Sequence, residues 1–231
     1  MAGYARPELL AETDWLAQHL ADPNIRIIDC DDPEAYKRAH IPGAVALPIH
    51  HYIKDPENPQ YVMSAEMFAE AMGSLGVSND TTVVVYDGDA GHYACRLWWA
   101  LDYYGHSRAK VMNGDWTKWF AEGRPINIDV PAVKPARFQI RPGPDSLCTL
   151  DDVRNAIGDK GAVIWDVRSR EEHIGQDPRE NKYSGHIPGA VHLEWRRLVD
   201  ENKHGVWKPA QELRRMLAEA GITPDRVVLS H

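Results

Sequence analysis

The sequence predicts an α/β protein of two similar halves, each a mostly parallel sheet flanked by helices. Short runs of aliphatic residues alternate with segments of helical periodicity, which is the pattern of βαβ units. Three blocks of sequence then recur in the same order at nearly constant spacing, which indicates a tandem duplication. The second copy stops at a point that matches the middle of the first, so we expect it to be incomplete.

The composition is that of a globular protein: 231 residues, 43% hydrophobic and 26% charged. No apolar run approaches a membrane span and the N-terminus lacks the apolar core of a signal peptide, so we expect no membrane partner. A net charge of −8 without a basic stripe argues against a nucleic-acid partner. Three scattered cysteines, Cys30, Cys95 and Cys148, form no disulfide framework or metal motif and indicate a cytoplasmic compartment.

The first helix and strand are predicted near the N-terminus. Pro7 suits the first turn of a helix over residues 7–20, in which leucines recur roughly on one side. Residues 25–28 form an apolar strand that ends in Asp29, and a polar stretch with weak helical character follows. Residues 40–45, His-Ile-Pro-Gly-Ala-Val, form a tight turn into a short strand, because proline holds the residue before it extended and glycine permits a positive φ.

The centre of the first half is the predicted strand over residues 83–86 and its loop over 87–92. Ser64 caps the amphipathic helix before this strand, and a helix over 93–104 follows the loop. The remaining elements are a strand at residues 111–112 and a helical turn at 116–119. Because ligands of such sheets lie at the carboxyl ends of the strands, the loop after Tyr86 is a candidate site.

A proline-rich stretch separates the two halves. Four prolines punctuate residues 125–143 without helical periodicity, so we expect a linker there, with 138–140 as a candidate strand. The predicted domains are residues 1–124 as an N-terminal domain and 144–231 as a truncated C-terminal domain.

The second half repeats the first in order. Its predicted elements are a helix capped by Thr149, a strand over 163–165 ending in Asp166, the turn over 186–191, a helix opened by Pro209 and a strand over 226–231. Asp166 lies 137 positions after Asp29, and the second His-Ile-Pro-Gly-Ala-Val turn lies 146 positions after the first. The difference of nine marks an insertion between Arg168 and Gly185.

The final strand matches residues 83–86 at a spacing of 145, so residue 232 would be the counterpart of Asp87. The first copy runs about 45 to 50 residues past Asp87, so we expect a similar length after His231 in a complete chain. A domain without that part would expose a large apolar surface. We therefore expect the remaining segment to be present as a separate piece, or the second domain to be poorly ordered.

These motifs resemble the rhodanese-like sulfurtransferases. The resemblance rests on the two His-Ile-Pro-Gly-Ala turns after strands that end in aspartate, on Val83–Asp87 with Arg96-Leu97-Trp98-Trp99, and on Asn113-Gly114-Asp115-Trp116. It covers essentially the whole chain. It implies two rhodanese-like domains and a transferase that moves a sulfane sulfur from thiosulfate or 3-mercaptopyruvate to cyanide or a thiol through a cysteine persulfide.

The resemblance also implies which half is catalytic. In the family the C-terminal domain carries a nucleophilic cysteine directly after the strand that matches residues 227–231, so a cysteine is expected after His231 and this chain holds no catalytic residue itself. Asp87 is the counterpart in the inactive loop. A thiolate at such a strand end faces backbone N–H groups and a helix N-terminus, which stabilise it as an anion. No metal and no cofactor are expected.

The candidate substrate-binding residues are Arg168, Arg170, Glu172, Arg179 and His231. In the thiosulfate-using relatives an arginine follows the Asp-x-Arg motif, whereas the alignment places Glu172 there, with Arg170 or Arg179 as substitutes. His231 would adjoin the nucleophile and tune its pKa. Each candidate has a structural alternative: Arg168 as an ion-pair residue, for example, and the others as solvated charges.

Two other functions fit the same residues. A non-catalytic rhodanese-like binding or regulatory protein would carry Asp or Gly after His231. A phosphatase of the same fold would need a longer loop of the Cys-x5-Arg type there. At the residue level, Asp87 fits a loop cap, Cys95 a buried helical thiol, and His40 and His186 structural hydrogen bonds.

Overall fold

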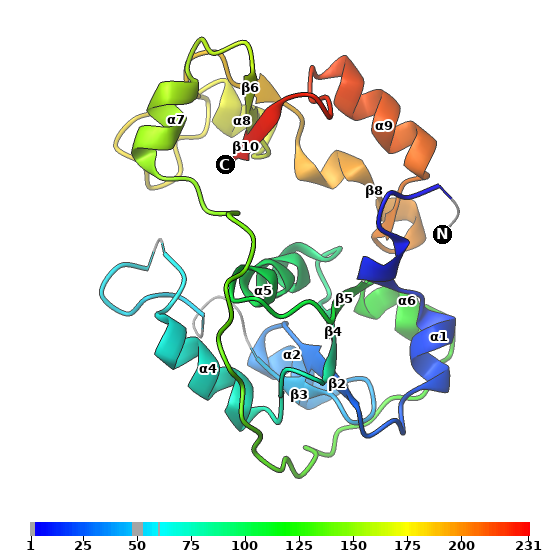
Figure 1. The fold of residues 1–231 in the computed structure, drawn as a ribbon. Helices are drawn as coiled ribbons and strands as arrows, with labels where there is room; N and C mark the ends of the chain where they lie inside the picture. The colour runs from blue at the N-terminus through cyan, green and yellow to red at the C-terminus, as the bar shows by residue number, and fades with distance from the viewer. Residues whose placement is uncertain (1–2, 48–52, 60) are drawn as a thin grey trace. The chain divides into compact units, whose positions relative to one another are not determined.

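The computed structural model describes residues 3–47, 53–59 and 61–231, which form two compact units (Figure 1). The first unit comprises Arg6–Ser146 together with Glu201–Val206. The second unit comprises the N-terminal residues up to Ala5, Leu147–Asp200 and Trp207–His231. Each unit contains a parallel sheet with helices beside it, so the predicted fold class is confirmed. No helix among the described residues has the length and apolar character needed to span a membrane.

The first unit is built on a five-stranded parallel sheet in the order β1-β5-β4-β2-β3. Its strands are β1 (Leu10–Ala11), β2 (Ile25–Asp29), β3 (Val45–Ala46), β4 (Thr82–Tyr86) and β5 (Ala109–Met112). Its helices are η1 (Pro7–Leu9), α1 (Thr13–Gln18), α2 (Pro33–Arg38), α4 (Ala65–Ser74), α5 (His92–Tyr103) and α6 (Trp116–Ala121). The central strand β4 is buried on both faces: Val83 and Val85 belong to one apolar cluster and Val84 belongs to the other.

The prediction of one helix over residues 7–20 is wrong. The segment forms η1, then strand β1, then α1. Leu10 and Ala11 pair in parallel with Val111 and Met112, which gives β5 a neighbour on its outer side. The tertiary pairing therefore overrides the helical spacing of the leucines, as short apolar segments allow.

The second unit contains a three-stranded parallel sheet in the order β10-β6-β7. Its strands are β6 (Ala162–Asp166), β7 (Val191–His192) and β10 (Val227–Ser230), and β8 (Val199–Asp200) pairs separately with β9 (Val206–Trp207). Its helices are α7 (Leu150–Ala156), α8 (Arg170–His173), η2 (Trp195–Leu198) and α9 (Ala210–Glu219), and η3 (Glu201–Lys203) follows β8. Thr149 caps α7 and Pro209 precedes α9, as predicted.

The strand pairing has the same register in both sheets. Ile25 pairs with Thr82 in the first unit, and Ala162 pairs with Val227 in the second. The bond that follows the strands also recurs, because Cys30 N–H donates to the Tyr86 carbonyl at 2.9 Å and Val167 N–H donates to the His231 carbonyl at 3.1 Å. His231 therefore stands in its sheet where Tyr86 stands in the first.

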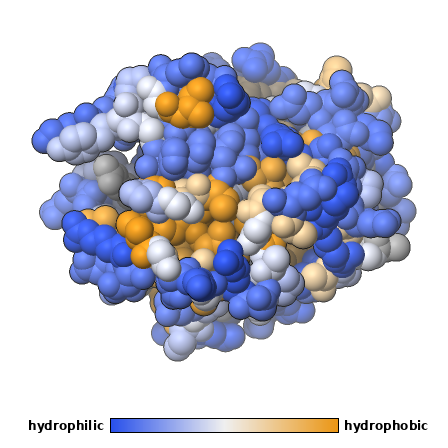
Figure 2. Space-filling model, turned by 90° about the horizontal axis from the view of Figure 1, so that it is seen from above, coloured by the Kyte–Doolittle hydropathy of each residue, from blue (hydrophilic) through white to orange (hydrophobic). Residues whose placement is uncertain are grey.

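Strand β10 forms an edge of its sheet and pairs only with β6 among the described residues. Val227 is 66% exposed and Val228 is 42% exposed, whereas Val83, the counterpart of Val228, is buried. In Figure 2, hydrophobic residues, coloured orange, form a patch within a mostly hydrophilic surface on the face that is shown. The second sheet thus presents an apolar strand edge, a feature that folded proteins usually cover.

The segment predicted as a linker packs along the first unit. His40 and Asn127 form an antiparallel bridge, and Ala136 N–H donates to the Gly73 carbonyl at 2.9 Å. Residues 138–140 form no strand; Phe138 instead is buried against Phe68. Backbone hydrogen bonds and one aromatic side chain therefore fix this irregular segment.

We expect Phe138→Ala to destabilise the first unit by about 3 kcal/mol, because it leaves a cavity in the apolar cluster. Chemical denaturation followed by tryptophan fluorescence measures the change. Ile140→Ala is the matched control, since Ile140 lies in the same segment but is 37% exposed. Equal stability of both variants would contradict the packing of Phe138.

His106 makes the stability of the first unit depend on pH. The ring is buried beside Phe138, and burial lowers the pKa of His106 to about 4. The unfolded chain takes up the proton near pH 6.5, so stability falls as the pH drops from that value towards 4, by about 2 to 3 kcal/mol. His106→Leu should flatten this slope between pH 7 and pH 4.5 in denaturant titrations. A slope that stays as steep in the variant would show that other groups cause it.

Candidate functional site

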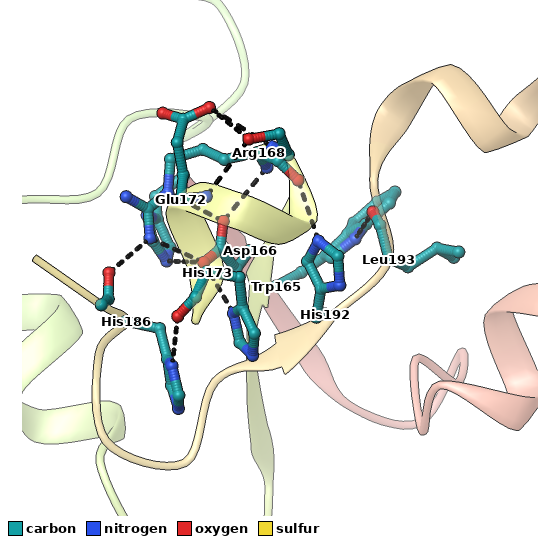
Figure 3. A network of polar contacts seen from close by, with 11 residues as sticks. Trp165, Asp166, Arg168, Glu172, His173, His186, His192 and Leu193 are labelled. Atoms are coloured by element: carbon teal, nitrogen blue, oxygen red, sulfur yellow. Dashed lines mark hydrogen bonds and ion pairs between the residues drawn. The ribbon is translucent and has the colours of Figure 1, made fainter. Parts of the chain in front are cut away.

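The site in the second unit is organised around Asp166, the last residue of β6, whose side chain is fully buried (Figure 3). Arg168 Nε donates to Asp166 Oδ1 at 2.9 Å and Arg168 Nη2 donates to Oδ2 at 2.7 Å. His173 Nδ1 donates to Oδ2 at 2.9 Å. Burial alone would raise the pKa of Asp166, but the bonds from Arg168 and His173 hold it well below its usual range. Asp166 is therefore an ionised, bidentate partner of Arg168.

Three imidazoles stack beside this ion pair. The His173 ring lies 3.9 Å from that of His186 and 4.5 Å from that of His192, measured between centroids. His186 Nδ1 donates to the His173 carbonyl at 2.7 Å, and His192 Nε2 donates to the Arg168 carbonyl at 2.9 Å. The stack therefore joins α8, the turn before β7 and β7 itself into one polar cluster.

His231 reaches the same cluster from the end of β10. Its Nε2 lies 4.0 Å from Asp166 Oδ2. Burial lowers the pKa of His231, and Asp166 opposes that shift. The register described above places His231 here, since the end of β10 lies beside the end of β6.

An open pocket of about 380 Å³ lies in front of Arg168 and His231. Its lining consists of Arg168, Asn181, Lys182, Tyr183, Ser184, Gly185, His186, Ile187 and His231. Most of the wall comes from residues 181–187, which overlap the end of the range between Arg168 and Gly185 that holds the nine-residue insertion. The lining includes two permanent cations and two imidazoles but no carboxylate, so it fits an anionic ligand.

The five predicted substrate-binding residues divide into two groups. Arg168 and His231 line the pocket, whereas Arg170, Glu172 and Arg179 do not. Glu172 caps α8 through Ser169, whose hydroxyl donates to its carboxylate at 2.9 Å. Arg179 pairs with Glu172 at 3.4 Å and with Asp177 at 3.2 Å.

Sequence reasoning missed Lys182 and the stacked histidines His173 and His192. The insertion was visible as a change of spacing, but no local pattern shows which of its side chains turns towards the pocket. His173 and His192 carried a signal, because they stand 137 and 146 positions after Tyr36 and Ala46, where the first half has no imidazole.

The matching loop of the first unit shows how this fold holds an anion. Both oxygens of Asp87 accept from the backbone: Oδ1 from the N–H of Asp89 and Gly91 at 2.9 and 2.8 Å, and Oδ2 from the N–H of Tyr93 and Ala94 at 2.7 and 2.8 Å. Ala90 and Gly91 have φ of 55° and 87°, which turns successive N–H groups inwards. The loop is therefore an anion cradle filled by its own carboxylate.

The two units carry opposite charge around equivalent aspartates. In the first, Asp31 has Asp29, Asp87 and Asp89 near it, and burial together with Asp29 and Asp87 raises the pKa of Asp31 to about 7. In the second, the counterpart of Asp31 is Arg168. The first site thus gathers carboxylates, whereas the second pairs its aspartate with a guanidinium.

Residues 12–122 and 149–229 match the rhodanese-like domain family, and the chain belongs to that family. The match covers most of both units and includes β2, β4, β6 and both His-Ile-Pro-Gly-Ala turns, and it ends at residue 229, two residues before His231. The expected family is therefore confirmed.

Individual relatives agree with this assignment. The chain is 38% identical to the sulfur carrier protein TtuD of Thermus thermophilus, over 98% of the chain and 83% of the relative. It is 32% identical to a putative thiosulfate sulfurtransferase of Haloferax volcanii, over 99% of the chain and 82% of the relative. The crystal structure of SseA from Escherichia coli, a 3-mercaptopyruvate sulfotransferase, superimposes with a TM-score of 0.85 at 28% identity, over 96% of this chain and 87% of SseA.

We expect Asp87→Ala to destabilise the first unit by about 3 kcal/mol, because it leaves four inward N–H groups without an acceptor. Added sulfate should restore part of the loss by occupying the cradle. Asp87→Asn keeps one acceptor oxygen, so its stability should lie between that of the wild type and that of Asp87→Ala. Thermal unfolding with and without sulfate measures the effect, with exposed Glu70→Ala as the control. An Asp87→Ala protein as stable as the wild type would contradict the role of the four bonds.

Proposed function

We propose that the complete protein is a sulfurtransferase that moves a sulfane sulfur from thiosulfate or 3-mercaptopyruvate to cyanide or a thiol. The observation that carries this proposal is the shared strand end: His231 stands where Tyr86 stands, and the residue after Tyr86 sits in an anion cradle. A cysteine after His231, in a loop built like that of Asp87, would hold its sulfur as a thiolate among inward N–H groups.

The reaction is a double displacement. The thiolate attacks the outer sulfur of thiosulfate, the sulfur–sulfur bond of the donor breaks, and sulfite leaves with the electron pair. The cysteine is left as a persulfide. Cyanide or an acceptor thiolate then attacks the outer persulfide sulfur and releases the cysteine thiolate. Every step conserves charge and needs no oxidant, metal or organic cofactor.

The pocket beside His231 supports an anionic donor. Lys182 supplies positive charge, while Arg168 pairs with Asp166 at 2.7 Å, so that Asp166 does not repel an anion. The first unit gathers carboxylates at its matching loop, so we place the donor at the second. The proposed partners are a small-molecule sulfur donor and a thiophilic acceptor. We propose that the protein meets them in the cytoplasm, and that the segment expected after His231 completes the second unit.

A carrier role is the second candidate, supported by the similarity to a protein named a sulfur carrier. A carrier would form the same persulfide and pass its sulfur to an acceptor without rapid turnover on cyanide. A purely non-catalytic binding protein, the other alternative, would form no persulfide, so the mass measurement described below distinguishes it from both candidates.

The test is thiocyanate formation from cyanide with each donor, using the complete chain. We expect Lys182→Ala to raise the KM for thiosulfate about tenfold with little change in kcat, because the variant loses one charge contact to the donor. Lys160→Ala, an exposed lysine of the same unit, is the matched control. No thiocyanate from either donor, together with no gain of one sulfur atom in the protein mass after incubation with thiosulfate, would reject sulfur transfer.

A further inference from the structure

His231 and Asp166 in the second unit occupy the positions of a buried, hydrogen-bonded pair in the first unit. There, Tyr86 Oη donates to Asp29 Oδ2 at 2.5 Å, and both side chains are buried. In the second unit the imidazole of His231 lies 4.0 Å from the same oxygen of the equivalent aspartate. A phenol at this position keeps its proton at neutral pH, whereas an imidazole takes up and releases one there.

The surroundings of His231 favour the neutral ring, and only Asp166 among the neighbouring groups opposes this preference. Charged and titratable groups face it from each element packed against it: Asp166 on β6, Arg168 after β6, His173 on α8, His186 on the turn before β7, and Lys182 across the pocket. Burial disfavours a charged ring, and so do the neighbouring cations; Asp166 favours it. Nε2 is buried and has no hydrogen-bond partner among the described residues. A new negative charge at the strand end would shift this preference towards the imidazolium.

We propose that His231 is a positioning residue that takes up a proton as the adjoining cysteine ionises, and that Asp166 then holds the imidazolium through Nε2. The inference rests on the proposed function, because it needs a cysteine after His231. A charge at the aspartate that ends the strand acts on the following loop. In the first unit, Asp29 interacts electrostatically with Asp87. Their counterparts in the second unit are Asp166 and the expected cysteine.

The proton balance follows directly. The thiol S–H bond breaks and its proton goes to solvent, while His231 takes one proton from solvent and gains its bond to Asp166. The positive charge of the imidazolium then adjoins, one residue along the chain, first the thiolate and afterwards the persulfide, which carries the same charge. The two groups titrate as a coupled pair, so the reactive ion pair forms at a lower pH than a thiolate alone would.

The test compares His231→Tyr, which installs the residue of the first unit, with wild type in the complete chain. We expect the thiol pKa, followed by thiolate absorbance, to rise by about one unit. The kcat/KM for thiosulfate should fall about tenfold at neutral pH and recover at alkaline pH, where the thiol ionises without help. His231→Gln should show the same changes in thiol pKa and kcat/KM. It serves as a second variant in case His231→Tyr fails to fold.

The wild type supplies a spectroscopic signature. The imidazole resonance of His231 should follow the titration of the thiol, and should shift when the thiol is alkylated. His19→Tyr, the same substitution in the first unit, should leave the pH profile unchanged. If the wild type transfers sulfur and both His231 variants keep its thiol pKa and pH profile, the role of His231 is overturned while the proposed function stands. A wild type that forms no thiocyanate rejects the proposed function itself.

Discussion

Parallel pairing between a strand that ends in aspartate and its neighbour fixes the geometry of both sites. In each unit the aspartate, Asp29 or Asp166, closes the strand, and the next strand brings its last residue alongside. Because successive side chains of a strand point to opposite faces, a slip by one residue would turn the end side chain to the other face. The apolar clusters on the two sides of the first sheet oppose such a slip, since Val83 and Val84 would exchange environments.

On this common scaffold the two units carry opposite chemistry. The first fills its anion cradle with the carboxylate of Asp87 and places Asp31 beside it. The second places Arg168 where the first has Asp31, and its aspartate bonds to His173, on which His186 and His192 stack. The same backbone pairing thus carries a carboxylate in one copy and a guanidinium in the other, which shows how a duplicated fold can vary its side chains without a change in the sheet.

Much of this arrangement could be predicted from local sequence. The strands that end in Asp29 and Asp166, the two proline–glycine turns and the caps at Ser64 and Thr149 depend on residues close together in the chain. The first helix could not be predicted, because its leucine spacing suits a helix while Leu10 pairs with Val111, about a hundred positions away. Element boundaries follow such distant partners and not propensity alone.

The sequence by itself determined the family, the α/β fold in two halves, the position of the insertion and the strand end where chemistry is expected. Only the tertiary structure decided which charges meet there. Arg179, a natural candidate from its sequence position, is engaged by Glu172 and Asp177, while Lys182 three residues later lines the pocket. Repeats and turns are encoded by neighbours along the chain, but the direction of a loop side chain and the protonation of an imidazole depend on residues that only folding brings together.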